Sequence, residues 1–247
     1  MSTQSPPVHL PEATIRAPKI RERGRLHYGA KRALDLFGAS LALLLLLPLL
    51  FLCALLIKIE SRGPAIFVQS RVGARRRRRD PAPDGGTWEP QPFRFYKFRT
   101  MIEDADPTIH EAHIRDFVTG RPIDSGARGA RFKLAADPRV TRVGMVLRRT
   151  SLDEVPQLIN VIRGDMSLVG PRPVPIYEAA LYEDHHLARF RAKPGITGLW
   201  QVNGRSNVSF DEMMRLDLSY VEHESILLDL KILIRTGPAV LRGKGAA

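Results

Sequence analysis

The chain has 247 residues, and 38 lysines and arginines against 26 acidic residues give it a formal net charge of +12 at pH 7. This charge favours an anionic partner, and the absence of zinc-finger, RNP-like and helix-turn-helix patterns argues against nucleic acid as that partner. The single cysteine, Cys53, excludes both a disulfide framework and a thiolate metal site.

Residues 1–27 are rich in proline and charge and lack apolar periodicity, so we expect a disordered basic tail. A cleavable signal peptide is not expected, because the first apolar segment starts too far into the chain and no small-residue cleavage site follows it. The structured part is therefore predicted to begin near residue 28.

An uncharged apolar run from Leu36 to Ile57 is long enough to cross a bilayer as one helix. Pro48 lies in its middle, where proline kinks or breaks a helix. The run has basic residues on both sides, whereas a spanning helix carries them mainly on the cytoplasmic side. These features favour a re-entrant helix over residues 28–60, although proline-kinked helices also span membranes. Both topologies remain open from the residues alone.

The segment after this helix contains one predicted strand and two predicted loop inserts. Ala65–Gln69 is typical of a short strand, while residues 74–92 and 119–131 have the composition of loops. The first insert contains five consecutive arginines, Arg75–Arg79. They form either a solvated surface or a contact with anionic lipid headgroups, where each cation contributes about 1 kcal/mol.

Between the inserts, the segment Phe93 to Arg99 alternates aromatic and basic residues. As a strand it would place Lys97 and Arg99 on the same face as Phe93 and Phe95. That face is either a solvated strand edge or part of a site. His110 and His113 form an H-x-x-H pair, which has too few ligands for a zinc site.

Residues 148–173 hold the most unusual combination of side chains. Asp153 and Glu154 lie where a helix is predicted to begin, and Thr150 or Ser151 would be its N-cap with a carboxylate three residues later. Both acids would then complete a capping box and complement the helix dipole.

A second interpretation of these acids rests on the residues around them. Arg148 precedes them, and Arg172 follows the helix that Gly164 is expected to end. Arg172 lies between Pro171 and Pro173, and these prolines favour an extended backbone that would aim its guanidinium group at phosphate. Paired acids can hold Mg²⁺ or attack phosphorus. Together these residues indicate a phosphoryl-transfer site.

The C-terminal third contains a glycine-rich segment, residues 193–206, followed by two predicted helices. The first segment is either an ordered loop that packs Trp200 or a substrate contact through residues such as Arg205. Helices are predicted over Phe210–Tyr220 and Ile226–Leu241. The last one is too charged to span a membrane and is typical of an amphipathic helix at the interface. A core helix in an oligomer is the alternative.

Six motifs follow one another along the chain: KRALDLFGA, GPAIFVQSRVG, FYKFRTM, ADPRVTRVG, TSLDEVPQLINVIRGDMSLVGPRP and KPGITGLWQVNGRS. Over most of residues 28–240 this pattern resembles the bacterial polyprenyl-phosphate sugar-1-phosphate transferases. These are the monotopic phosphoglycosyl transferases that initiate exopolysaccharide and glycoconjugate synthesis. So many motifs in one order make the resemblance specific.

The resemblance implies a helix-rich α/β catalytic domain, residues 61–247, on the cytoplasmic face of the bacterial inner membrane. A proline-kinked re-entrant helix and interfacial amphipathic helices would hold this monotopic membrane protein, and anionic membrane lipids would be partners. A homodimer is also considered. The implied reaction moves a sugar-1-phosphate from a nucleoside diphosphate sugar, expected to be a UDP-hexose, to polyprenyl (undecaprenyl) phosphate and releases UMP.

The resemblance also assigns roles to residues. Asp153 would be the nucleophile that forms an aspartyl phospho-sugar, and Glu154 would help to hold Mg²⁺ or assist proton transfer. Phosphate oxygens would be bound by Arg148 and Arg172. The remaining residues expected at the site are Pro171, Pro173, Lys97, Arg99 and Arg205.

Two other functions remain alternatives at this point. An enzyme that transfers the whole sugar would leave a nucleoside diphosphate and would need no aspartyl nucleophile. A non-catalytic, membrane-anchored basic scaffold of a polysaccharide assembly system would tolerate Asp153→Asn. No residue pattern identifies the sugar.

Overall fold

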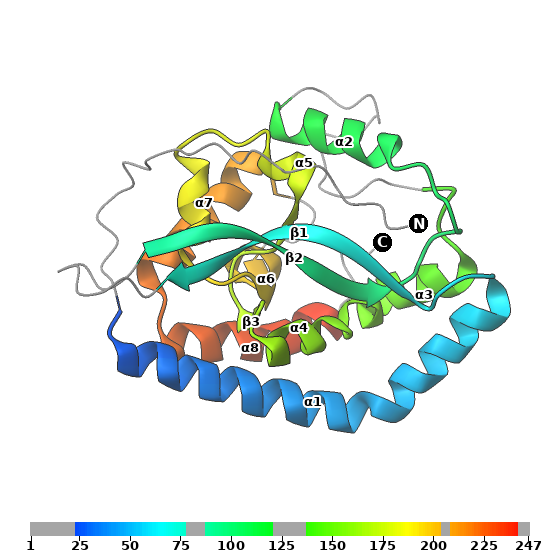
Figure 1. The fold of residues 1–247 in the computed structure, drawn as a ribbon, viewed down its shortest axis with the longest axis horizontal. Coiled ribbons are helices and arrows are strands. Elements are labelled where there is room, and N and C mark those ends of the chain that lie inside the picture. Colours follow the sequence, from blue (N-terminus) through cyan, green and yellow to red (C-terminus); the bar gives the residue numbers. More distant parts are fainter. Residues whose placement is uncertain (1–22, 78–86, 121–136, 204–207, 242–247) are drawn as a thin grey trace.

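A helix of 36 residues, α1 (Arg25–Glu60), runs along one side of the molecule in the computed structural model (Figure 1). The structure describes residues 23–77, 87–120, 137–203 and 208–241. Only 11 % of the apolar window of α1 is buried inside the protein, so this is not the core helix of a soluble domain. By length and composition α1 is a candidate membrane anchor. It starts at Arg25, within the segment expected to be a tail.

The remaining elements form a mixed, helix-rich α/β domain on one side of α1, as predicted. In chain order they are β1 (Ile66–Arg77), β2 (Thr87–Phe98), α2 (Thr108–Val118), α3 (Arg142–Thr150), the 3-10 turn η1 (Leu152–Glu154), α4 (Gln157–Arg163), β3 (Ser167–Val169), β4 (Val174–Pro175), α5 (Ile176–Ala179), the 3-10 helix η2 (His186–Arg191), β5 (Gly195–Thr197), α6 (Leu199–Asn203), α7 (Phe210–His223) and α8 (Ile226–Leu241).

A long antiparallel hairpin, β1–β2, forms the centre of the domain. Its ladder pairs Ile66 with Phe98 at one end and Arg77 with Thr87 at the other, and β4 pairs with the middle of β1. The loop expected over residues 74–92 is therefore wrong at both ends, because twelve-residue strands occupy these positions. Backbone hydrogen bonds between the two strands continue the ladder through polar residues, which the amino-acid composition alone assigned to a loop. Residues 78–86 lie outside the described part, as do residues 121–131 of the second expected insert.

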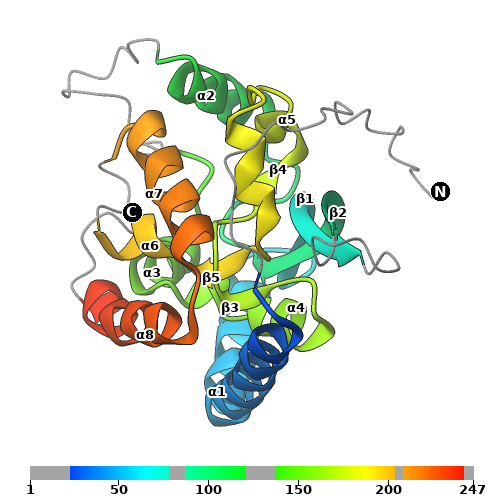
Figure 2. The same cartoon turned by 90° about the vertical axis from the view of Figure 1, so that its left-hand side faces the viewer.

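Both halves of α1 pack against this same domain. Ala39, in the first half, belongs to an apolar cluster with residues of α4 and β2, including Leu158 and Phe95. In the second half, Cys53 and Ile57 pack against Phe98 of β2 and Leu147 of α3. Figure 2, in which α1 is seen nearly along its axis, shows α4 and α8 beside it. The two ends of α1 are therefore attached to one body, with Pro48 between them.

The largest apolar cluster lies away from α1, where the hairpin meets η2, α6 and α7. Trp200 is 3 % exposed within this cluster, as expected if the glycine-rich segment packs its tryptophan. That segment is more regular than a loop, since it contains β5 and α6. The helices predicted over Phe210–Tyr220 and Ile226–Leu241 correspond to α7 and α8.

Candidate active site

Asp153 and Glu154 lie on the one-turn helix η1 between α3 and α4. The expected capping box is wrong. Ser151 instead ends α3 in the left-handed conformation, with φ 59°, and the Thr150 hydroxyl donates back to the Val146 carbonyl oxygen at 2.8 Å. The next helix begins only after Pro156, which can occupy a helix start because it has no backbone N–H to leave unpaired. Both acids are half-buried and stand in a tight connection between two helices.

Arg172 reaches η1 from the segment that follows β3. Its Nη1 donates to Oε1 of Glu154 at 2.9 Å, and both side chains are largely buried. The backbone under Arg172 is held by Arg189, whose Nη2 donates to the Arg172 carbonyl oxygen at 2.9 Å. Pro171 and Pro173 are both buried. Arg172 therefore makes a hydrogen bond from this segment to η1.

Lys97, near the end of β2, is a second cation that interacts electrostatically with Asp153. Burial and the nearby charge of Arg71 together lower the pKa of Lys97 to about 8, although Asp153 acts in the opposite direction. Its ammonium group also lies over the Phe67 ring, 5.2 Å from the centroid. Lys97 is still charged at neutral pH, and the carboxylate of Asp153 favours that charge.

Arg148, in the last turn of α3, completes the expected set around Asp153. Its Nε donates to Oγ1 of Thr100 at 2.9 Å. Burial lowers the pKa of Arg148, and Asp153 opposes that shift. In the same way, burial disfavours charge on Arg172, but Glu154 and Asp153 outweigh it and raise its pKa. Asp153 therefore lies among three partly desolvated cations, where a second anion would be strongly attracted.

Arg99 is engaged elsewhere. Its Nη2 donates to the carbonyl oxygen and the hydroxyl of Ser61 at 2.9 and 3.0 Å, and its Nη1 donates to the Arg62 carbonyl oxygen. Arg99 therefore binds the C-terminal end of α1, and none of these contacts supports its predicted role in phosphate binding, which stays a prediction. Arg205 lies outside the described residues.

Arg71 was not among the residues predicted at the site. Arg71 is 7 % exposed on β1. Its Nη1 donates to the Pro173 carbonyl oxygen at 2.8 Å, and its guanidinium group stacks 4.0 Å from the centroid of the Phe95 ring. Burial lowers the pKa of Arg71 to about 10, and Arg172 adds to this effect. The sequence feature that could have indicated Arg71 is the strand period of two, which puts Gln69 and Arg71 on the same face of β1.

His110 and Tyr177 were missed as well. Nδ1 of His110 lies 2.6 Å from the Tyr177 hydroxyl. Burial lowers the pKa of His110 to about 4, with a further contribution from Lys97, so the imidazole is neutral at pH 7. Only the folding of α2 over α5 brings these residues to the cations of the site.

An apolar groove of about 620 Å³ lies between the start of α4, the hairpin and the membrane helix α1. Pro156 and Ile159 line its wall on the α4 side, and Leu47, Pro48 and Phe51 line it on α1. Pro156, at the α4 side of this groove, follows Glu154 by two residues in the chain.

Within the described residues, no group of three or more His, Cys, Asp or Glu side chains could hold a metal ion. A pair of carboxylates is nevertheless what Mg²⁺ uses in many phosphoryl-transfer sites, where waters and substrate phosphates supply the other ligands. Asp153 and Glu154 are such a pair, so the residues present are compatible with Mg²⁺.

Comparison with known proteins places this site in a family. The model of the family described as bacterial sugar transferase matches residues 26–243, which include every element described above except the first residue of α1. The chain belongs to the bacterial sugar transferase family. This confirms the resemblance drawn from the sequence motifs.

Individual relatives agree with this assignment. The exopolysaccharide production protein ExoY of Rhizobium meliloti (strain 1021) is 40 % identical over 98 % of this chain and 96 % of its own length. A UDP-glucose:undecaprenyl-phosphate glucose-1-phosphate transferase of Caulobacter vibrioides is 42 % identical over 85 % of this chain and 69 % of its own length. An undecaprenyl-phosphate galactose phosphotransferase of Salmonella typhimurium is 38 % identical over 87 % of this chain, but the match covers only 41 % of that protein. The predicted enzyme class, a phosphoglycosyl transferase, is thereby confirmed.

Proposed function

We propose that this transferase moves a sugar-1-phosphate from a UDP-sugar to undecaprenyl phosphate and releases UMP, as the first membrane step of exopolysaccharide or glycoconjugate synthesis. The names of the relatives support this substrate pair. The observation that carries the proposal is the position of Asp153 among Lys97, Arg148 and Arg172. A carboxylate surrounded by cations can meet a diphosphate without net charge repulsion.

In the proposed first step, a carboxylate oxygen of Asp153 attacks the β-phosphorus of the UDP-sugar. A bond forms between this oxygen and phosphorus, and the bond from phosphorus to the bridging oxygen breaks, so the electron pair leaves with UMP. In the second step, a phosphate oxygen of undecaprenyl phosphate attacks the same phosphorus. The aspartyl–phosphorus bond then breaks and Asp153 is regenerated, which implies ping-pong kinetics.

The cations of the site have distinct tasks in this scheme. The guanidinium groups of Arg148 and Arg172 suit bidentate contacts with phosphate oxygens. Lys97 supplies a point charge beside Asp153, and its pKa of about 8 keeps it protonated at neutral pH. Arg71 lies deeper and holds the Pro173 carbonyl oxygen, so we assign it to positioning the segment that carries Arg172.

We further propose that Asp153 and Glu154 hold Mg²⁺ together with the substrate phosphates. When bound, the metal ion would neutralise charge on the diphosphate and on the departing UMP. Arg172 fixes one oxygen of Glu154, so this carboxylate enters the site with a defined orientation.

We also propose a re-entrant anchor with the domain on the cytoplasmic face, and the packing of α1 supports the re-entrant part of this proposal. Both halves of α1 contact the same catalytic domain, so both ends of the helix would lie on one side of the membrane. On α8, Leu227 and Ile234 are 63 and 75 % exposed, as in a helix that rests on the membrane interface. The apolar groove beside Pro156 would accommodate the first isoprene units of the acceptor.

The direct test measures UMP release by purified protein in nanodiscs with Mg²⁺, undecaprenyl phosphate and a panel of UDP-sugars. We expect turnover with one donor, loss of turnover on chelation, and loss in Asp153→Asn. Acid quenching with a sugar-labelled donor and no acceptor should leave label on the wild type but not on Asp153→Asn.

Asp184→Asn is the matched control, because Asp184 is an exposed acid on a turn away from η1. It should retain both UMP release and labelling. Full activity of Asp153→Asn would reject the covalent mechanism. Release of UDP would support transfer of the sugar alone, and no product from any donor would favour the scaffold.

A further inference from the structure

A second cavity, of about 740 Å³, lies where the N-terminal part of α1, the end of α4 and the hairpin meet. It shares no residue with the cluster around Asp153. Its charged lining is strongly basic, with Asp165 as the single acid against six cations: Arg32, Arg75, Arg76, Arg94, Arg163 and Lys193. Two of these cations, Arg75 and Arg76, begin the arginine run whose role the transfer reaction leaves unexplained. We call this cavity the basic pocket.

Two cations of the basic pocket are held in place by the C-terminal end of α4. Arg32 donates through Nη1 to the Val161 carbonyl oxygen at 2.6 Å and through Nη2 to that of Ile162 at 2.7 Å. Lys193 Nζ donates to the Gly164 carbonyl oxygen at 2.9 Å. A bound anion would otherwise be repelled by these carbonyl groups. Arg32 and Lys193 cover the carbonyl oxygens at the end of α4, so this side of the pocket, which we call its floor, is positively charged.

Gly164 shows how closely the two cations converge. It ends α4 with φ 88°, and a Cβ added there would lie 3.4 Å from Nη2 of Arg32 and 3.8 Å from Nζ of Lys193. The other walls are exposed. Arg75 and Arg94 come from the paired strands of the hairpin and reach solvent. The pocket therefore has a fixed cationic floor and an accessible cationic rim.

The position of the basic pocket relates it to the membrane. Arg32 lies one helical turn before Leu36, where the uncharged apolar run of α1 begins. Phe37 and Leu41 on the following turn are 70 and 44 % exposed. If α1 is immersed in lipid, the pocket lies at the depth of the headgroups, where the phosphates of anionic lipids are concentrated.

We propose that the basic pocket binds the headgroup phosphate of an anionic phospholipid and so fixes the depth and orientation of the domain at the membrane. The ligand is a bilayer lipid and is consumed in no reaction. This inference does not depend on the transfer chemistry, because lipid binding can be measured without a donor sugar.

The test is calorimetric titration of the full-length protein in detergent with dioctanoyl phosphatidylglycerol, below its micellar concentration. Parallel titrations use dioctanoyl phosphatidylcholine and inorganic phosphate. We expect saturable binding of phosphatidylglycerol and much weaker binding of the zwitterionic lipid. Arg75→Gln combined with Arg94→Gln should weaken phosphatidylglycerol binding about tenfold or more, because both charges lie at the rim.

A matched control combines Arg115→Gln and Arg215→Gln, which removes the same charge from exposed positions on α2 and α7. It should bind phosphatidylglycerol like the wild type, and the Arg75→Lys, Arg94→Lys pair should bind nearly as well. Equal weakening in the glutamine variant and the control would show non-specific attraction and overturn the proposal. Three other results would also overturn the proposal. These are equal binding of the two lipids, binding of inorganic phosphate but not of phosphatidylglycerol, and the absence of saturable binding. UMP release in detergent should be similar in all of these variants, which separates lipid binding from transfer.

Discussion

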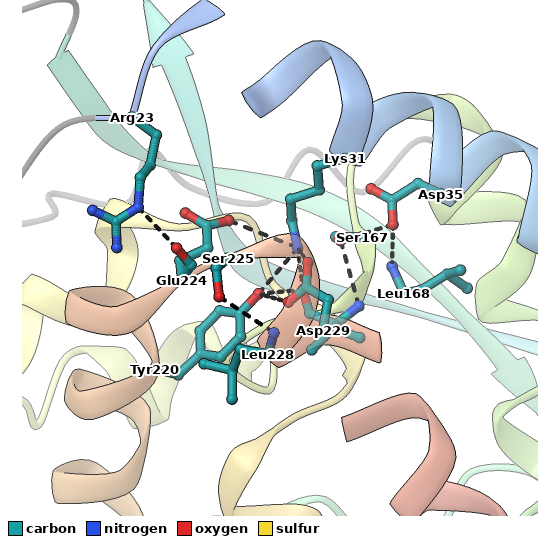
Figure 3. A network of polar contacts seen from close by, with 11 residues as sticks. Arg23, Lys31, Asp35, Ser167, Leu168, Tyr220, Glu224, Ser225, Leu228 and Asp229 are labelled. Carbon is teal, nitrogen blue, oxygen red and sulfur yellow. Dashed lines mark hydrogen bonds and ion pairs between the residues drawn. The ribbon is translucent and has the colours of Figure 1, made fainter. Parts of the chain in front are cut away.

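The Nζ atom of Lys31 on α1 lies 2.5 Å from Oδ2 of Asp229 on α8, and both side chains are buried (Figure 3). Tyr220 completes this network, since its hydroxyl donates to Asp229 at 2.7 Å and accepts from Lys31 at 3.0 Å. Glu224 lies on the other side of Lys31, at 3.7 Å. The membrane helix is thus joined to the C-terminal helices by a buried ion pair.

Removal of Lys31 should be strongly destabilising. Lys31→Met leaves Asp229 and Glu224 buried without their cation, and breaking a buried pair in this way costs about 3–5 kcal/mol. We expect a lower unfolding midpoint in detergent, followed by circular dichroism. Lys58→Met is the control, because Lys58 lies exposed at the other end of α1 and should leave the midpoint unchanged. Equal midpoints for the two variants would contradict a stabilising role of the pair.

Replacement of Arg172 by lysine should impair transfer although the charge is kept. Lysine cannot reproduce the planar fork that binds Glu154 and is proposed to bind phosphate. We expect UMP release to fall about 100-fold, the usual effect of removing one donor from a charge-stabilising site. Arg149→Lys, an exposed neighbour on α3, should be nearly unaffected.

The contact between Arg172 and Glu154 should also make the effects of substituting these two residues on UMP release non-additive. Arg172→Ala and Glu154→Gln each remove the same interaction, so the double variant should lose less activity than the sum of the two single effects. A simply additive result would mean that the two residues act independently.

The pH dependence of transfer should reflect Lys97. Its ammonium form is required beside the substrate phosphates, and its pKa of about 8 means that this form is lost as pH rises through 8. UMP release should therefore decline on the alkaline side near pH 8. Lys97→Arg should move this decline to higher pH, because arginine stays protonated. Superimposable alkaline profiles for the two proteins would exclude Lys97 as the titrating group.

The lowered pKa of Lys97 also predicts that the free energy of unfolding rises with pH, whereas the rate of transfer falls. The pKa of Lys97 is lower in the folded protein than in the unfolded chain, where it is near 10.4. Below pH 8 its buried charge costs stability, and this cost is relieved as pH rises between about 8 and 10. Unfolding free energy measured in denaturant for wild type and Lys97→Met should therefore converge over this range.

Arg99 should influence stability more than catalysis. Arg99→Gln removes hydrogen bonds to the end of α1, and bonds from a charged group are typically worth about 1.5–3 kcal/mol. We expect a lower unfolding midpoint and an unchanged KM for the UDP-sugar. Arg62→Gln, which changes an exposed side chain at the same helix end, should have little effect. A raised KM with unchanged stability would support the phosphate-binding role predicted from the sequence.

Local signals in the sequence predicted the parts of this protein that depend on neighbouring residues. The apolar run of α1 and the stop at Gly164 follow from residue type and spacing, and the structure contains both. The order of the motifs also identified the family. These features need no knowledge of which segments meet in space.

Contacts between distant segments were decided only by the tertiary structure. The hairpin register brings Arg71 under Arg172 and extends both strands into an expected loop. Packing at the end of α1 occupies Arg99, and the tight turn after α3 replaces the capping box around Ser151. The physical reason is that a charged side chain has several partners of similar energy within its reach. Burial then decides among them, because an unpaired group away from water is far more costly than any local preference.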